Sequence, residues 1–229
     1  MSDASTVDGL IVALGSELEP VKPLRPPLWR AALWIGAVAL TGSVMAAFAD
    51  LPGIAHRLSG APDMWLAVLG STLTAMLGAI AVFQLSVPDR SSLWALLPLP
   101  SLAVWIGASG LGCMRTWVVP EMSSASMGET GVCFTFIVGV SIPLSALTAI
   151  MVRQAYPLRP GLTATVAGLT VAAGAATLLN FFHPYDASAE DLAVHLAAVA
   201  LVIGCNQIWA GRPIAHARSG WDSGRRPPN

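Results

Sequence analysis

Six stretches of the 229-residue sequence contain no Asp, Glu, Lys or Arg, and this distribution of charge constrains the fold more than any other feature. The charge-free windows are 31–49, 64–88, 91–114, 130–152, 160–185 and 192–211. Each window has 19 to 26 residues. An α-helix needs about 20 apolar residues to cross a hydrocarbon core of about 30 Å. The sequence therefore predicts an all-α integral membrane protein with six transmembrane helices.

The composition agrees with this class. Hydrophobic residues make up 55% of the chain and charged residues 11%, whereas a soluble domain carries about 25% charged residues. The net charge of −1 offers no basic surface for a polyanion, so we expect no direct binding of nucleic acid. Three cysteines are too few for a disulfide-rich secreted scaffold.

We expect three parts along the chain. Residues 1–27 form an N-terminal segment with an amphipathic helix, 28–211 a six-helix transmembrane domain, and 212–229 a tail expected to be disordered. The spans are predicted at about 29–49, 64–87, 93–113, 132–152, 161–182 and 191–210. The two longer connections are 50–63 and 113–131.

Basic residues lie mostly on one side of the predicted membrane. Ten of the twelve are on that side: Lys22, Arg25, Arg30, Arg90, Arg153, Arg159, Arg212, Arg218, Arg225 and Arg226. The other side carries Arg57 and Arg115. The positive-inside rule therefore places both the N-terminus and the C-terminus of this multi-pass protein in the cytoplasm.

The predicted spans carry little chemistry. We expect no carboxylate or basic residue inside them, and His195 is the single imidazole near one, which disfavours ion-coupled transporters and pumps. The sequence has no phosphate-binding loop, no His-Glu-x-x-His and no nucleophile elbow, so we predict that it is not an enzyme. In the fifth span a stripe of small residues predicts close helix packing within the bundle. The stripe is Ala164, Gly168, Ala172 and Ala176.

Cys113 ends the third predicted span and Cys133 begins the fourth, so both are expected near the outer membrane surface. His183 and His195 are assigned to the same side. Three interpretations remain open for the two thiols: a disulfide, a soft-metal or oxidant sensor completed by an imidazole, or two small buried apolar side chains. Cys205, deep in the sixth span, is expected in the core.

The N-terminal segment contains apolar residues at helical spacing. They are Val7, Leu10, Ile11, Leu14 and Leu18. A helix this short needs a surface to cover its apolar stripe, and the acidic residues beside the stripe disfavour the membrane surface. The segment is therefore predicted to dock in a groove of a partner protein, with docking on the protein's own inner loops as the alternative.

Short motifs along residues 10–210 occur in a recognisable order. They are Leu10-Ile11-x-Ala13-Leu14, Pro20-Val21-x-Pro23-Leu24-x-Pro26-Pro27, Val87-Pro88-x-Arg90, Trp94-Ala95-Leu96-Leu97-Pro98, Gly112-Cys113-x-Arg115-x-Trp117, Gly128-Glu129-x-x-x-Cys133, Pro157-Leu158-Arg159-Pro160-Gly161-Leu162-Thr163 and His195. With these motifs the chain resembles the NrsF-type family, negative regulators of sigma F, which are membrane-bound anti-sigma factors of bacteria.

The resemblance implies a function and a set of sensing residues. Such proteins hold an extracytoplasmic-function sigma factor at the inner membrane and release it under metal or oxidative stress. Cys113 and Cys133 match two cysteine positions of the family, and His195 matches a histidine. His183 stands where the family commonly has a cysteine before a proline, and histidine can replace cysteine as a metal ligand but not in a disulfide. Cys113, Cys133 and His183 would bind a soft metal transiently, and no permanent cofactor is expected.

Two alternative functions belong to other classes of membrane protein. A membrane thiol–disulfide oxidoreductase would use Cys113 and Cys133 catalytically, but such enzymes usually carry a Cys-x-x-Cys pair and here 19 residues intervene. The other alternative is a passive structural membrane protein or a small pore.

Overall fold

The computed structural model describes residues 3–16, 23–60, 62–118, 127–155, 157–182 and 189–222, which form helices and no strand. The helices are α1 Asp3–Ser16, α2 Pro27–Ala46, α3 Leu51–Gly60, α4 Pro62–Leu85, the 3₁₀-helix η1 Ser92–Leu96, α5 Leu99–Val118, α6 Met127–Arg153, α7 Pro160–Leu179 and α8 Ala189–Asp222. The all-α class predicted from the charge-free windows is confirmed.

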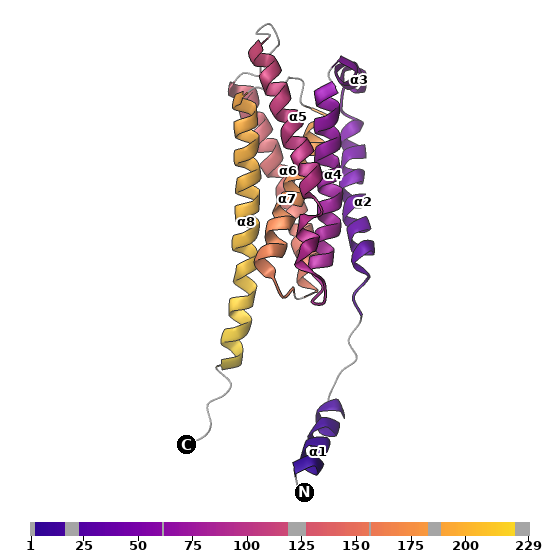
Figure 1. Cartoon of the computed structure of the whole chain (residues 1–229), viewed down its shortest axis with the longest axis vertical. Helices are drawn as coiled ribbons and strands as arrows, with labels where there is room; N and C mark the ends of the chain where they lie inside the picture. The colour runs from indigo at the N-terminus through magenta and orange to yellow at the C-terminus, as the bar shows by residue number, and fades with distance from the viewer. Residues whose placement is uncertain are drawn as a thin grey trace.

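Five segments of the described chain are long and apolar enough to cross a membrane. They are Pro27–Ala46, Asp63–Leu85, Ser92–Leu111, Gly131–Arg153 and Pro160–Leu179. The sixth predicted span lies in α8, whose described apolar run, Leu192–Ile208, is shorter. Figure 1 shows α8 beside the other long helices along the height of the bundle, so α8 is a member of it.

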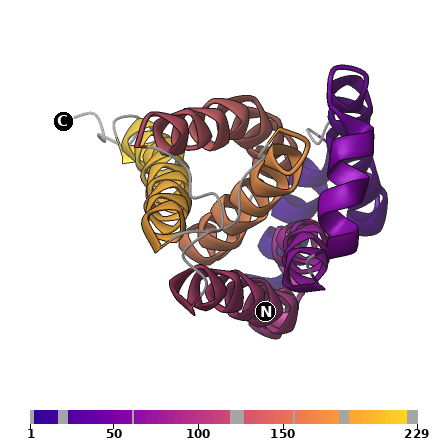
Figure 2. The same cartoon turned by 90° about the horizontal axis from the view of Figure 1, so that it is seen from above.

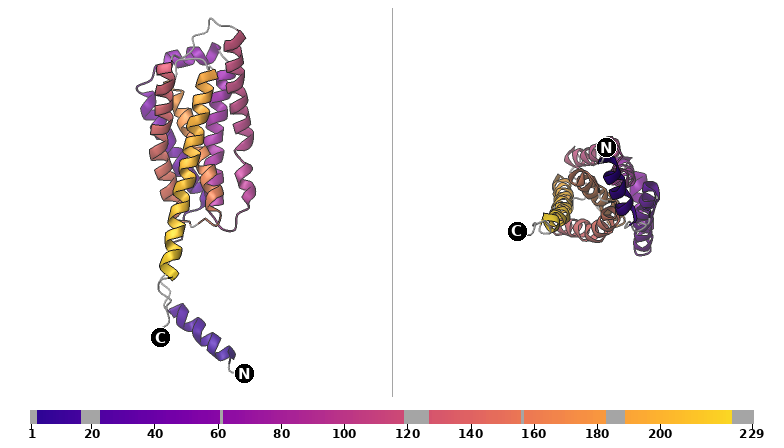
Figure 3. Two further views of the ribbon diagram at one scale, coloured as in Figure 1. Left: turned by 90° about the vertical axis from the view of Figure 1, so that its left-hand side faces the viewer. Right: turned by 90° about the horizontal axis from the view of Figure 1, so that it is seen from below.

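The bundle has two distinct ends. α3 lies across one of them, which we call the α3 end, and η1 lies at the opposite end, the η1 end (Figure 1). The chain enters the bundle through α2 at the η1 end, and α8 leaves the bundle there. Figure 3 shows α1 and the last turns of α8 projecting from this same end. α1 and the last turns of α8 therefore lie on one side of the bundle.

α7 is the central helix and packs mainly against α4, α6 and α8, while α5 packs mainly against α4 (Figure 2). Ala164, Ala172 and Ala176 of the predicted small-residue stripe are buried. At Gly168 an added Cβ would lie 2.6 Å from the Cα of Ile203 in α8, so only glycine permits this approach. The stripe therefore packs within the bundle, as predicted from its spacing.

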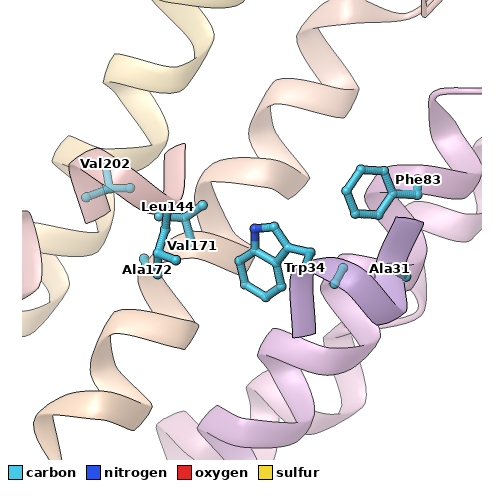
Figure 4. Packing of buried hydrophobic residues seen from close by; sticks show 8 residues of the cluster. Ala31, Trp34, Phe83, Leu144, Val171, Ala172 and Val202 are labelled. Carbon is cyan, nitrogen blue, oxygen red and sulfur yellow. The ribbon is translucent and has the colours of Figure 1, made fainter. Parts of the chain in front are cut away.

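Trp34 of α2 is the largest fully buried side chain among those that the structure describes, and it inserts between α6 and α7 (Figure 4). Its Nε1 donates to Thr148 Oγ1 at 2.8 Å. Similar bonds join other helix pairs, among them Thr74 to Ser101 at 3.1 Å and Asn206 to Ser145 at 3.0 Å. Hydrogen bonds of this kind, together with close packing, hold helices together where lipid leaves no hydrophobic driving force between them.

Three elements differ from the expected connections and spans: α3, η1 and α8. The connection 50–63 contains α3, which begins where the Asp50 carboxylate accepts the Gly53 N–H at 3.1 Å and so satisfies a first-turn donor. The third span begins with η1, and α5 starts only at Leu99, because Pro98 and Pro100 lack the N–H groups that would continue a helix. α8 also continues beyond its apolar run to Asp222.

Candidate functional site

Cys133 lies on α6 at the α3 end, where three helices meet. Its side chain is 6% exposed and belongs to a buried cluster with Ile137 of α6, Ala175 and Leu179 of α7, and Ala198 of α8. A thiol in this position packs as a small apolar group. Any change in its volume or charge would press on all three helices, because packed interiors hold little free space.

His195 lies on α8 one turn before Ala198, on the same face of the helix. The structure therefore brings Cys133 and His195 to one level of the bundle, on facing helices. Cys113 lies in the last turns of α5 at the same end, with its side chain outside the described part. His183 lies outside the described residues. A disulfide between Cys113 and Cys133, metal binding by Cys113, Cys133 and His183, and a sensing role of His195 therefore stay predictions.

The described side chains form no group of three or more His, Cys, Asp or Glu that would hold a metal ion. Cys205 is exposed on α8 rather than buried, so its assignment to the core is wrong. The reason is its place on a helix at the edge of the bundle, which packs mainly against α7 and α6 and leaves the side that carries Cys205 open.

Arg30, in the first turns of α2, is a buried cation that the sequence analysis did not predict. Its side chain is 4% exposed, and Nη1 donates to Ser86 Oγ of the segment after α4 at 3.1 Å. Nη2 donates to the carbonyl oxygen of Met151 on α6, and Cζ lies 4.9 Å from the ring centroid of Phe83. One guanidinium thus joins α2, α4 and α6 at the η1 end through neutral partners.

The expectation that no basic residue lies inside a span is therefore wrong at Arg30. Arginine tolerates this position because its planar group donates in several directions and stacks on an aromatic ring. A signal was present in the sequence: Arg30 is spaced one turn from Trp34, and Arg30, Ala31 and Trp34 share a helix face that turns inward.

α1 presents its apolar side chains to solvent. Val7, Leu10, Ile11 and Leu14 are 54–61% exposed, and Val12, off the predicted stripe, is 72% exposed. Figure 1 shows α1 apart from the bundle, beyond the η1 end. The N-terminal helix is present where the spacing predicted it, and Leu18 lies outside the described residues. Nothing in the described structure covers the stripe.

The η1 end carries four arginines whose described side chains are exposed. Arg25 precedes α2, Arg90 precedes η1, Arg153 ends α6 and Arg159 caps α7, and all four are exposed. Among the described residues of the loops at this end, Asp89 is the acidic one. The η1 end is therefore basic, and it is the end from which α1 projects.

These features define a class: a polytopic all-α membrane protein with an uncovered helix at its basic end and a thiol packed between helices at the other. The chain matches the family model NrsF, described as negative regulator of sigma F, over residues 14–215, and it belongs to this family. It is therefore a negative regulator of a sigma factor, and a regulatory family favours the expectation that it is not an enzyme. Neither a curated protein nor a solved structure matches the chain. The matched range begins at Leu14, so most of α1 precedes it.

Proposed function

We propose that this protein is an anti-sigma factor of the bacterial inner membrane, with both termini in the cytoplasm. It sequesters an extracytoplasmic-function sigma factor and releases it when metal or oxidative stress acts on the extracytoplasmic side. The observation that carries the proposal is the uncovered apolar stripe of α1 in a chain of a sigma-regulator family.

The orientation follows from charge. The exposed arginines Arg25, Arg90, Arg153 and Arg159 gather at the η1 end, and basic residues favour the cytoplasmic side of a membrane. This orientation puts α1 in the compartment where a sigma factor acts, and the lipid bilayer around the bundle keeps the captured partner away from transcription.

Capture uses the stripe of Val7, Leu10, Ile11, Leu14 and Leu18. An amphipathic helix docks in an apolar groove through residues at i, i+3, i+4 and i+7, and this is the spacing of the first four. The first four of these side chains already stand exposed, so their docking requires no rearrangement of the bundle. A groove with basic residues at its edge would complement the acidic residues Asp3 and Asp8 of α1.

Sensing involves Cys113, Cys133, His183 and His195 at the α3 end. Oxidation of the thiols, or transient binding of a soft metal by Cys113, Cys133 and His183, changes the volume and charge at the junction of α6, α7 and α8. We propose that this change shifts the packing of α6 between two arrangements.

α6 and Arg30 supply a physical connection between the two ends. Cys133 lies near the start of α6, and the carbonyl of Met151 near its end accepts from Arg30. Arg30 lies on α2, a few residues after the segment that leads from α1. A displacement of α6 therefore acts, through the Arg30 side chain, on the start of α2, to which the N-terminal segment is joined. In this proposal the contact between Arg30 and the Met151 carbonyl is the element that switches between two arrangements when the sigma factor is released.

Capture is tested by co-purifying the sigma factor encoded beside this protein with the full chain in detergent. Leu10→Asp/Leu14→Asp puts two charges into the stripe and is expected to abolish recovery of the sigma factor. Val12→Asp adds a charge to the same helix, off the stripe, and serves as the matched control, so recovery should stay at the wild-type level. Equal recovery with the double variant would defeat docking through this stripe.

Sensing is tested by sigma-dependent transcription in cells exposed to cadmium or peroxide. Cys113→Ser and Cys133→Ser are expected to abolish induction while basal repression persists. Cys205→Ser, which changes an exposed thiol of α8, should leave induction intact. A normal response in both sensor variants would assign the two thiols a structural role only.

A further inference from the structure

A cavity of about 500 Å³ opens at the α3 end of the bundle. Phe48, Asp50 and His56 line it from the segment that joins α2 to α3 and from α3 itself. Phe181 and Phe182, directly after α7, form the other wall. The volume lies in the range of sites for small molecules, about 300–1,000 Å³. None of these residues has a role in the function proposed above.

The acidic group of the cavity is held in place. Asp50 Oδ1 accepts the Gly53 N–H at 3.1 Å, and Oδ2 makes no hydrogen bond among the described residues. Gly53 is required for this arrangement, because a methyl group at position 53 would collide with Oδ2. The turn therefore fixes a carboxylate on the wall with one oxygen available to a ligand.

The remaining surroundings also favour a positive charge. α2 ends at Ala46 and α7 ends at Leu179, and both C-terminal ends lie beside the cavity. The C-terminal end of a helix carries partial negative charge. The faces of aromatic rings attract cations too. Three phenylalanine rings suit an alkylated ammonium group better than a hydrated metal ion, because the rings replace water with apolar contact.

We propose that this cavity binds the ammonium group of a small organic cation. Asp50 supplies the charge, and Phe48, Phe181 and Phe182 supply the ring walls. The cavity lies at the end of the spans, so the same chemistry has two sources: the ethanolamine headgroup of a neighbouring lipid or a soluble amine. Phe182 also contacts Phe136 of α6, with ring centroids 5.9 Å apart, so the cavity shares a wall with the Cys133 cluster.

The test uses the full-length protein in nanodiscs of phosphatidylglycerol, with choline as the probe and its methyl resonances followed by saturation-transfer NMR. Asp50→Asn keeps an oxygen acceptor for the Gly53 N–H but removes the charge, and it is expected to raise the Kd about fivefold. Asp89→Asn, at the η1 end, is the matched control and should leave the Kd unchanged. The uncharged isostere 3,3-dimethyl-1-butanol should bind about tenfold more weakly than choline.

Equal binding of choline and its isostere, an unchanged Kd in Asp50→Asn, or no saturable binding of millimolar choline to the wild type would each overturn the proposal. Gly53→Ala is the second variant: it keeps the carboxylate but displaces it, and binding should weaken again. Replacing part of the phosphatidylglycerol by phosphatidylethanolamine separates the two sources. A rise in the apparent Kd for choline identifies the lipid headgroup as the occupant, and a constant Kd identifies a soluble amine.

Discussion

Replacing Arg30 by lysine and, separately, by methionine tests whether a single guanidinium ties three helices together at the η1 end. Lysine keeps the charge but has one donor nitrogen, so it reaches either Ser86 or the Met151 carbonyl and loses the flat contact with Phe83. A hydrogen bond between membrane helices contributes about 0.6–1.7 kcal/mol, and a desolvated cation–ring contact about 2 kcal/mol. Arg30→Lys should therefore lower the free energy of unfolding by about 2 kcal/mol.

Arg30→Met loses all three contacts but also removes a buried charge whose described partners are neutral. Ser86 is not left without a partner, because its Oγ donates to the Phe83 carbonyl at 2.7 Å. Removing a buried ion recovers a desolvation cost of several kcal/mol, so replacement by an apolar side chain of similar volume is often neutral. We therefore expect Arg30→Met to be no more destabilising than Arg30→Lys.

The assay is reversible unfolding of the purified protein in mixed micelles, with increasing dodecyl sulfate and helicity followed by circular dichroism. Arg25→Lys, at an exposed position just before α2, is the control and should change stability by less than about 0.5 kcal/mol. Wild-type stability of Arg30→Lys would refute the claim that the several donor nitrogens of one guanidinium hold the three helices together. A methionine variant much less stable than the lysine variant would show that the charge itself is stabilised by an anionic partner.

Two further predictions concern packing. Gly168→Ala should destabilise the bundle by about 1–3 kcal/mol, because the new Cβ would lie 2.6 Å from the Ile203 Cα. Gly204→Ala is the control and should leave stability unchanged, because a Cβ at position 204 meets nothing within 4 Å. Equal stability of the two variants in the same unfolding assay would contradict the close approach of α7 and α8. Trp34→Phe should lower the free energy of unfolding by about 1 kcal/mol, since it removes the hydrogen bond to Thr148. A double-mutant cycle with Thr148→Val should show a coupling energy of that size. Additive effects of the two substitutions would mean that the bond contributes nothing to stability.

Much of the architecture follows from where charges are missing. The five long spans could be predicted because an apolar run of about 20 residues has few alternatives to a membrane helix. The small-residue stripe around Gly168 predicted close contact within the bundle, because only small side chains let two helix backbones approach each other closely. α3 was missed because its polar residues resemble a loop, although Asp50 followed by Leu51 and Pro52 is a helix-start signal.

The candidate site was only partly predictable. The N-terminal stripe depends on local spacing, which the sequence displays directly. The spacing of Arg30 and Trp34 indicates an inward-facing side of α2, but the partners of Arg30, Ser86 and Met151, are 56 and 121 residues away in the chain, so no local pattern shows them. The cavity beside Asp50 requires α2 and α7 to end at the same level, and this too is a property of the assembled bundle.

Sigma-factor capture by α1 requires that the η1 end of the bundle face the cytoplasm and the α3 end the opposite side of the membrane. In a cysteine-free background, Phe48→Cys marks the α3 end and Leu158→Cys the η1 end, at positions that are 81% and 72% exposed. A membrane-impermeant maleimide added to intact spheroplasts should label position 48 at once and position 158 only after lysis. Labelling of position 158 in intact cells would place α1 outside the cytoplasm and contradict sigma-factor capture.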